Sequence, residues 1–239
     1  MTEPAAERKW VPLDYRERRV LGVLIEKGKT TPEYYPMTIA ALVSGCNQKS
    51  NRDPVTNFDA DDAEDILQGL RKKGAVIMVE GSGRVVRWKH TLYEWLGVSK
   101  VEIALVAELL LRGSQTEGDL RARASRMEPL ADLATLQTHL EALAAKGLVV
   151  YLSPPGVRRG VMVTHGLSAP AELDREKQKH AQGAPDEDET PARSASSLAP
   201  RPLGLADDVA TLRAEVAALR AEVSALASEV AALKTALGA

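Results

Sequence analysis

A seven-residue repeat runs through the C-terminal segment, residues 207–239, in which valine and leucine alternate at spacings of three and four residues. Residues at this spacing form one narrow apolar stripe along a helix, and such a stripe is buried only against another helix. We therefore predict a coiled coil for this segment. Its seam consists of Val209, Leu212, Val216, Leu219, Val223, Leu226, Val230 and Leu233.

The charges beside this seam predict the orientation of the helices. A parallel pair sets acidic residues of one helix opposite basic residues of its partner, whereas an antiparallel pair sets acid against acid. The attractive pairs are Asp208 with Arg213, Glu215 with Arg220, and Glu229 with Lys234. β-Branched valine alternating with leucine favours two strands. We expect a parallel homodimer; the alternative is an amphipathic helix that packs on the chain's own globular part.

Residues 168–206 have the composition of a linker. They contain five prolines, several serines and the acidic run 186–189. Within this segment, residues 171–182 lack proline and are rich in good helix formers. We therefore predict a proline-rich, acidic linker that is compatible with a partly helical start.

Composition places the chain among soluble proteins. It has 239 residues, of which 44% are hydrophobic, and a net charge of −2. The N-terminal extension, residues 1–12, is polar and does not resemble a secretory signal, and no apolar run approaches the length of a membrane span. The single cysteine, Cys46, excludes an internal disulfide framework and a cysteine-rich metal site. We expect a cytoplasmic protein with no membrane partner.

Upstream of the linker, the chain repeats one order of elements. Helical patterns at residues 14–27, 37–44 and 59–73 precede two short strands at 75–79 and 85–89, and we expect Gly28 to end the first helix. Helical patterns at 100–112, 116–124 and 130–146 precede strands at 148–152 and 157–164. Three helices closed by a β-hairpin are typical of a winged helix. The predicted fold class is mainly α with small β-hairpins (α+β), with tandem winged-helix domains at 13–97 and 98–167.

Several short motifs identify a family resemblance. The run CNQKSNRDP at residues 46–54, preceded by LIEK at 24–27 and TPEYYP at 31–36, resembles the signature of the YceH-like family of bacterial proteins. LLLRGSQT at 109–116 and GDLR at 118–121 resemble its second half. The resemblance covers about residues 13–167 and also the C-terminal coiled coil. It implies two winged-helix domains and supplies no catalytic or binding residues.

The third helix of each repeat is a poor candidate for reading DNA. In a DNA-binding winged helix this helix enters the major groove. The helix at 59–73 begins with five carboxylates, which repel phosphates and suit a helix N-terminus. The helix at 130–146 is no more basic.

Polar and basic residues elsewhere offer a different surface for nucleic acid or a protein partner. Amide, hydroxyl and cationic side chains donate hydrogen bonds to phosphate and sugar oxygens. The candidates are Asn47, Gln48, Lys49, Ser50, Asn51 and Arg52 between two helices, Arg84, Arg87 and Lys89 in the hairpin, and Arg121, Arg123 and Arg126 in the second repeat. The structural alternative is that the first group contains turn and capping residues, with Arg52 paired to a carboxylate such as Asp53.

Enzyme chemistry has no support in the sequence. The four histidines, at 90, 139, 165 and 180, lack the spacing of metal ligands, and Cys46 has no histidine nearby. We therefore expect no enzymatic activity, no bound metal and no cofactor. Two functions remain: a dimeric DNA-associated or regulatory protein, or a scaffold whose winged helices bind other proteins.

Overall fold

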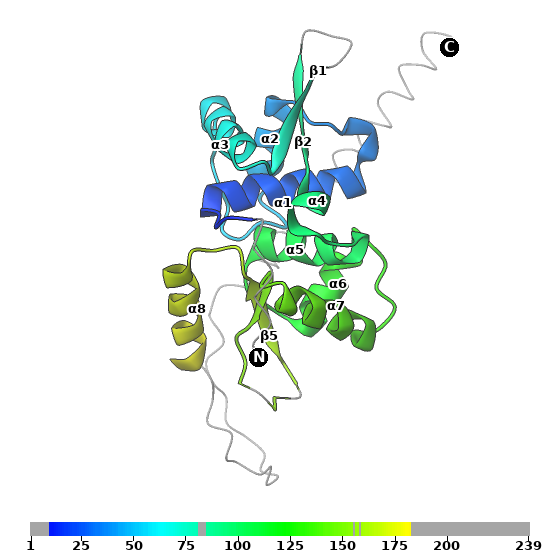
Figure 1. Cartoon of the computed structure of the whole chain (residues 1–239). Coiled ribbons are helices and arrows are strands. Elements are labelled where there is room, and N and C mark those ends of the chain that lie inside the picture. The colour runs from blue at the N-terminus through cyan, green and yellow to red at the C-terminus, as the bar shows by residue number, and fades with distance from the viewer. Residues whose placement is uncertain (1–9, 81–84, 155, 158, 183–239) are drawn as a thin grey trace, which may run out of the picture. The chain divides into compact units, whose positions relative to one another are not determined.

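The computed structural model describes residues 10–80, 85–154, 156–157 and 159–182. These residues lie in one compact unit that combines helices with small antiparallel sheets (Figure 1). The mixed α and β class is therefore as expected. The predicted coiled coil with all its seam residues, the linker beyond 182, and Arg84 lie outside the described residues.

The first repeat follows the predicted order, with two additional short helices. Its elements are α1 (Tyr15–Thr30), η1 (Pro32–Tyr34), α2 (Ile39–Cys46), α3 (Ala60–Lys72), β1 (Val76–Glu80), β2 (Val86–His90) and α4 (Leu92–Leu96). The prediction that Gly28 ends the first helix is wrong. The helix continues to Thr30 and is closed where the Thr31 N–H donates to the Lys27 carbonyl.

Capping boxes begin both α1 and α3. Asp14 accepts the Glu17 N–H while the Glu17 carboxylate accepts the Asp14 N–H, and Asp59 and Asp62 form the same reciprocal pair at α3. These bonds satisfy backbone donors that a helix N-terminus leaves unpaired. Part of the acidic start of α3 therefore has a local structural role, as the sequence pattern indicated.

The second repeat has the same order and one strand that was not predicted. Its elements are α5 (Lys100–Arg112), β3 (Gln115–Thr116), α6 (Glu117–Ala124), α7 (Leu133–Ala145), β4 (Val149–Tyr151) and β5 (Met162–His165), followed by α8 (Pro170–Gln182). The helix expected from residue 130 begins only at Leu133, because Asp132 provides the N-cap and accepts the Thr135 N–H.

The two sheets are both antiparallel, and in each the hairpin also pairs with the segment before the second helix of its repeat. β1 pairs antiparallel with β2, and β5 lies between β3 and β4 in an antiparallel sheet. β3 immediately precedes the second helix of its repeat. At the corresponding place in the first repeat, Met37 forms an isolated bridge with Trp88. Each repeat therefore ties the chain before its second helix to the hairpin.

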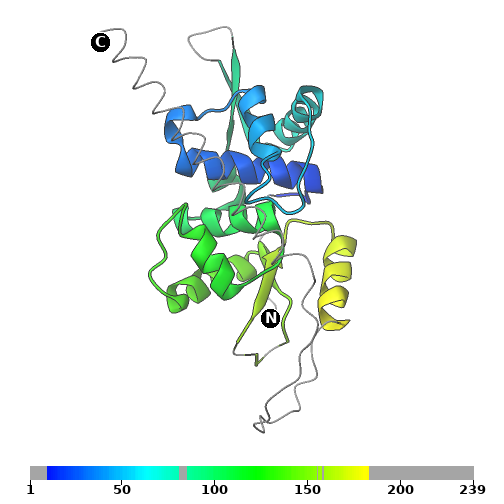
Figure 2. The ribbon, with the colours of Figure 1, turned by 180° about the vertical axis from the view of Figure 1, so that it is seen from behind.

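The two repeats share a continuous core in which α1 packs along α5. Figures 1 and 2 show these helices side by side from opposite directions. Leu21 and Leu24 of α1 are fully buried, as are Ile103 and Leu109 of α5. The close approach depends on Gly22, where a Cβ atom would lie 2.9 Å from the Leu111 side chain.

Helix α8 is attached to the body of the protein through side-chain hydrogen bonds. Arg18 of α1 donates to Ser168 Oγ at 2.8 Å and to Glu172 Oε2 at 3.0 Å. Ser114 bonds the carboxylate of Glu176. The start of the predicted linker is therefore a docked helix. Within the described part of the chain, no helix is both long and apolar enough to cross a membrane.

Candidate functional site

The turn after α2 is held by its own side chains. Asn47 Oδ1 accepts the Phe58 N–H at 2.8 Å, and Asn47 Nδ2 donates to the Phe58 carbonyl at 2.7 Å. Thr56 Oγ1 donates to the Cys46 carbonyl at 2.9 Å. Asn47 is therefore a turn residue that fastens residues 56–58 to the end of α2, in agreement with the structural alternative.

Arg52 is buried at the centre of this turn. Its Nε donates to the Gly45 carbonyl at 2.9 Å, and its guanidinium also bonds Gln48 Oε1 at 3.0 Å. Its ion-pair partner is Glu26 of α1, and the side chains are 0% and 3% exposed. Arg52 is therefore paired with a carboxylate, as in the structural alternative, but the carboxylate is that of Glu26 and not that of Asp53. A guanidinium enclosed in this way is not available to a phosphate.

The acidic partner remains ionised despite its burial. Burial raises the pKa of Glu26, but the hydrogen bond and charge of Arg52, together with Arg126, outweigh it and leave the pKa below its ordinary value. Arg126, from the second repeat, lies 2.5 Å from Glu26 Oε1. One carboxylate of the first repeat therefore receives cations from both repeats.

The same contacts continue into α5. Arg126 pairs with Glu108 at 3.1 Å, and Arg112 lies 3.1 Å from the same carboxylate and bonds Asn51. We call Glu26, Arg52, Glu108, Arg112 and Arg126 the inter-repeat cluster. It joins the CNQKSNRDP turn to the second repeat.

Backbone contacts reinforce this junction. The Asp53 N–H donates to the Leu111 carbonyl at 2.9 Å. Arg19 donates to the same carbonyl at 2.9 Å and to the Pro54 carbonyl at 2.5 Å. Burial is the largest of the effects that lower the pKa of Arg19, and the charge of Arg52 adds to it. The motif that carries the family resemblance therefore fixes the position of one repeat on the other.

The remaining candidates do not form one basic surface. Arg121 reaches the Ala131 carbonyl at 3.5 Å, and Arg123 bonds Gln115 Oε1 at 2.7 Å. Arg87 is exposed and donates to the Pro36 carbonyl at 2.9 Å. Lys49 and Ser50 are exposed. The structure thus brings Arg52 and Arg126 together around Glu26, with Arg52 buried and Arg126 at the surface.

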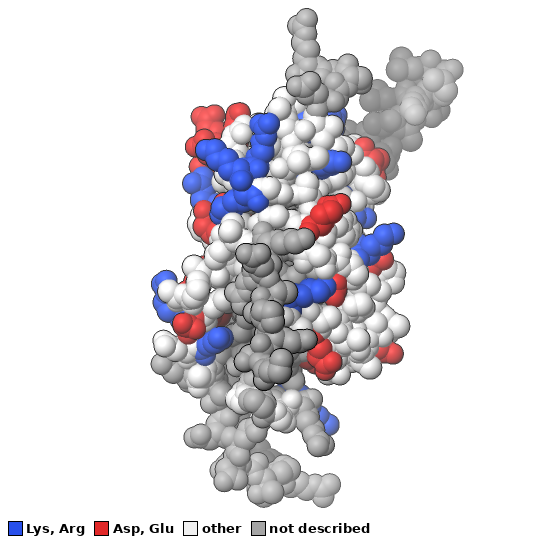
Figure 3. All heavy atoms as spheres, viewed as in Figure 1, with Lys and Arg blue, Asp and Glu red and all other residues white. Residues whose placement is uncertain are grey.

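Charge is distributed unevenly along α3. Asp61, Glu64 and Asp65 are exposed in its first turns, and Arg71 and Lys72 are exposed in its last. Figure 3 shows Lys and Arg side chains gathered over this side of the first repeat, in the upper left of the view, next to acidic side chains. Helix α3 therefore has an acidic first part and a basic last turn.

The β1–β2 hairpin exposes apolar side chains that the sequence analysis did not single out. Ile77, Val85 and Val86 are 40%, 59% and 38% exposed. Among the described residues, β1 has β2 as its only strand neighbour. The strand therefore carries an unpaired edge, which is a common attachment point for another chain. The uninterrupted apolar run Val76 to Val79 was the sequence signal, because a strand with one solvent-facing side ordinarily alternates apolar and polar residues.

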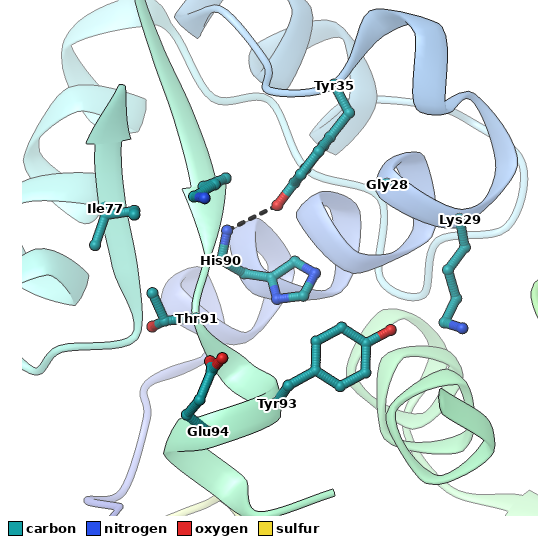
Figure 4. Close-up of a pocket in the computed structure, with 9 residues that line it drawn as sticks. Gly28, Lys29, Tyr35, Ile77, His90, Thr91, Tyr93 and Glu94 are labelled. Carbon is teal, nitrogen blue, oxygen red and sulfur yellow. Dashed lines mark hydrogen bonds between the residues drawn. The ribbon is translucent and has the colours of Figure 1, made fainter. Parts of the chain in front are cut away.

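A pocket of about 510 Å³ lies at the base of the same hairpin (Figure 4). It is lined by residues from the end of α1, from the loop before α2, from both strands and from α4. The lining residues are Gly28, Lys29, Tyr35, Ile77, Lys89, His90, Thr91, Tyr93 and Glu94. The sequence did not reveal this pocket, because the residues around His90 come from distant segments. Among the described residues, no group of three or more His, Cys, Asp or Glu side chains is placed to hold a metal ion.

Comparisons with known proteins identify relatives over most of the chain. The model of a family described as "Protein of unknown function, DUF480" matches residues 13–156. A UPF0502 protein of Rhodopirellula baltica is 48% identical over 193 residues, which are 79% of this chain and 81% of that protein. UPF0502 proteins of Pelobacter propionicus and Geobacter sulfurreducens are 46% and 47% identical, over 69% and 67% of this chain and 76% and 74% of their own lengths.

Proposed function

We propose that this chain, which belongs to the DUF480 family, is a non-enzymatic interaction protein whose first repeat binds a protein partner through the β1–β2 hairpin. The YceH-like resemblance agrees with this family. The observation that carries the proposal is the exposed apolar hairpin with an unpaired strand edge. The scaffold alternative of the sequence analysis thus becomes the leading function.

We infer that each repeat is a winged-helix module. Three helices followed by a hairpin occur twice in the same order, and the chain before each second helix is tied to the hairpin. The inter-repeat cluster makes one body of the two modules. A rigid pair of modules presents its hairpins in a constant relative position, which suits a scaffold.

Three features favour a protein partner over nucleic acid. Arg52 and Arg126 are engaged with Glu26, so they add little to attraction of phosphates. Exposed carboxylates occupy the start of α3, where a winged helix would approach DNA. Ile77 and Val86 offer apolar area beside an open strand edge, which supports strand addition by an extended peptide.

Dimerisation through residues 207–239 completes the proposal. The valine and leucine seam, with its complementary flanking charges, would bring two copies together in parallel. Two copies present two β1–β2 hairpins, so that a weak contact with each gains strength from the connection between them.

Site-specific photo-crosslinking in producing cells tests the hairpin surface. A photoreactive residue replaces Val86 in one variant and Gln178, exposed on α8, in the control. We expect a discrete adduct with another protein from position 86 only, and we expect Ile77→Glu to weaken it. Adducts that are the same from both positions, or that contain only this chain, would exclude the hairpin as the partner surface.

A second candidate function is association with DNA, for which Arg71 and Lys72 provide the specific observation. Both are exposed in the last turn of α3, on the side where Figure 3 shows cations gathered. Fluorescence anisotropy with long duplex DNA at increasing salt tests this function, because phosphate contacts give a steep salt dependence. Binding that falls in an R71A/K72A variant would support it. Absence of binding at low salt would exclude it.

A further inference from the structure

The pocket at the base of the β1–β2 hairpin has walls made of flat rings. The rings of Tyr35 and His90 lie with centroids 5.9 Å apart, and those of His90 and Tyr93 lie 5.7 Å apart. Figure 4 shows the His90 ring between the two tyrosines. Gly28 permits this arrangement, because its missing Cβ would lie 3.4 Å from the Tyr35 ring. The Tyr35 hydroxyl accepts the His90 backbone N–H at 2.8 Å and fixes the wall.

The hydrogen-bonding state of His90 follows from its neighbours. The Leu92 N–H donates to His90 Nδ1 at 3.3 Å, so the proton of the neutral ring is on Nε2. Burial, aided by the charges of Lys29 and Lys89 and opposed by that of Glu94, lowers the pKa of His90 to about 4. At neutral pH the ring is therefore an uncharged donor through Nε2.

The charged groups of the pocket differ in whether they are already paired. Lys29 forms an ion pair with Glu128 at 2.6 Å. Lys89 and Glu94 have no ion-pair partner among the described residues, and Lys89 is half-buried whereas Glu94 is exposed. Thr91 is occupied, because its hydroxyl donates to the Gly74 carbonyl at 2.6 Å. A half-buried unpaired ammonium is the strongest attraction that this pocket offers to a ligand.

We propose that this pocket binds a small aromatic carboxylate, with the ring against the wall that Tyr35, His90 and Tyr93 form and the carboxylate facing Lys89 and the His90 Nε2–H. Donors outnumber acceptors in the lining, and the one carboxylate, Glu94, is exposed to solvent. A volume of about 510 Å³ is within the usual range of small-molecule sites and leaves much of the space unfilled by a simple inorganic anion. Flat rings favour a flat ligand. The site shares Ile77 with the proposed partner surface but does not depend on the binding of a partner.

Nuclear magnetic resonance titration of the full chain with benzoate tests the proposal. The His90 ring resonances report on the site directly. We expect saturable shifts with benzoate, and much weaker shifts with benzamide, which keeps the ring without the charge. Lys89→Met should weaken benzoate binding about tenfold, because it removes a charge-assisted hydrogen bond. Lys179→Met on α8 is the matched control and should leave the affinity unchanged.

Two further measurements separate the contribution of the benzoate ring to binding from the contribution of its charge. Inorganic phosphate should not displace benzoate, and Tyr93→Ala should weaken benzoate binding while leaving the backbone spectrum of the second repeat intact. Equal binding of benzoate and benzamide would overturn the role of Lys89. Absence of saturable His90 shifts with benzoate in a folded protein would overturn the proposal as a whole.

Discussion

The carboxylate of Glu26 receives guanidinium groups from both repeats, Arg52 beside it in the first and Arg126 from the second. Charges held in the interior lose their hydration, and the loss is offset only when each has a close partner of opposite sign. Removing Glu26 therefore leaves Arg52 buried without its ion-pair partner. The position of the two repeats on each other depends on this single side chain more than on any exposed charge.

Glu26→Gln is expected to lower the free energy of unfolding by about 3–5 kcal/mol. The substitution keeps the shape of the side chain but leaves Arg52 and Arg126 without their shared negative charge. Urea unfolding followed by circular dichroism measures the loss. Asp174→Asn is the matched control, because Asp174 pairs with Lys177 at 3.9 Å on the surface, and it should change stability by less than about 0.5 kcal/mol. Equal effects of the two variants would contradict the role of the cluster.

Because the His165 side chain is buried, we predict that the protein loses stability in mild acid. The Nδ1 atom of this side chain has no hydrogen-bond partner within the described part of the chain. Burial, with a smaller effect from Arg18, lowers the pKa of His165 to about 3. The unfolded chain takes up this proton near pH 6.5. Between these two values the unfolded state binds more protons, so the free energy of unfolding falls as the pH is lowered.

For one group the decrease is about 1.4 kcal/mol per pH unit below 6.5, or about 2 kcal/mol by pH 5. Urea unfolding at pH 7 and pH 5 measures it. His165→Gln should have a shallower pH dependence than the unmodified chain, whereas His139→Gln serves as a control at a half-buried position. An unchanged slope in His165→Gln would show that the acid sensitivity has another source.

At the scale of elements, the packing around two helical glycines, Gly22 of α1 and Gly69 of α3, leads to opposite predictions. A Cβ at Gly22 would lie 2.9 Å from Leu111 Cγ, whereas one at Gly69 of α3 would lie 3.7 Å from Glu17 Oε1. Gly22→Ala should therefore destabilise the protein by about 1–2 kcal/mol through overpacking. Gly69→Ala should stabilise it by up to about 1 kcal/mol, because alanine favours the helix. Thermal unfolding of both variants checks the signs, and stabilisation by Gly22→Ala would contradict the close contact.

Long periodic elements were predictable and short or non-local features were not. The apolar period and the flanking glycine of α5 predicted the bounds Lys100–Arg112 that the structure has. β3 has two residues and α4 has five, which is too short for a periodic pattern to emerge. The capping role of the acids before α3 was readable, because a cap is a local interaction.

The candidate sites illustrate the same limit at a longer range. The residue type of Arg52 suggested a phosphate contact, but its partner Glu26 is 26 positions away and only the tertiary fold brings them together. The pocket around His90 also combines residues from distant segments, including Lys29 and Tyr35. Sequence spacing alone does not predict such contacts between distant segments, because they depend on how the helices and strands pack in the folded protein.

At the scale of the whole molecule, both ends of the described tandem repeats are fastened to one body. The Leu13 N–H donates to the Leu167 carbonyl at 2.8 Å, and Arg18 holds Glu172 of α8. The chain therefore leaves this body from a docked helix. A dimer formed through residues farther along the chain would connect two such bodies. Its effect on binding would be to present two β1–β2 hairpins to a partner instead of one.

We predict that the chain forms a dimer through the apolar seam of residues 207–239. Sedimentation equilibrium should give a dimer for the intact chain and a monomer for a version that ends before Arg201. Leu219→Glu should have the same effect as truncation, because it places a charge in the apolar seam. Ala218→Glu, outside the seam, is the control and should remain dimeric. A dimer that survives truncation would instead place the interface within residues 1–200, where the open edge of β1 would be the first surface to test.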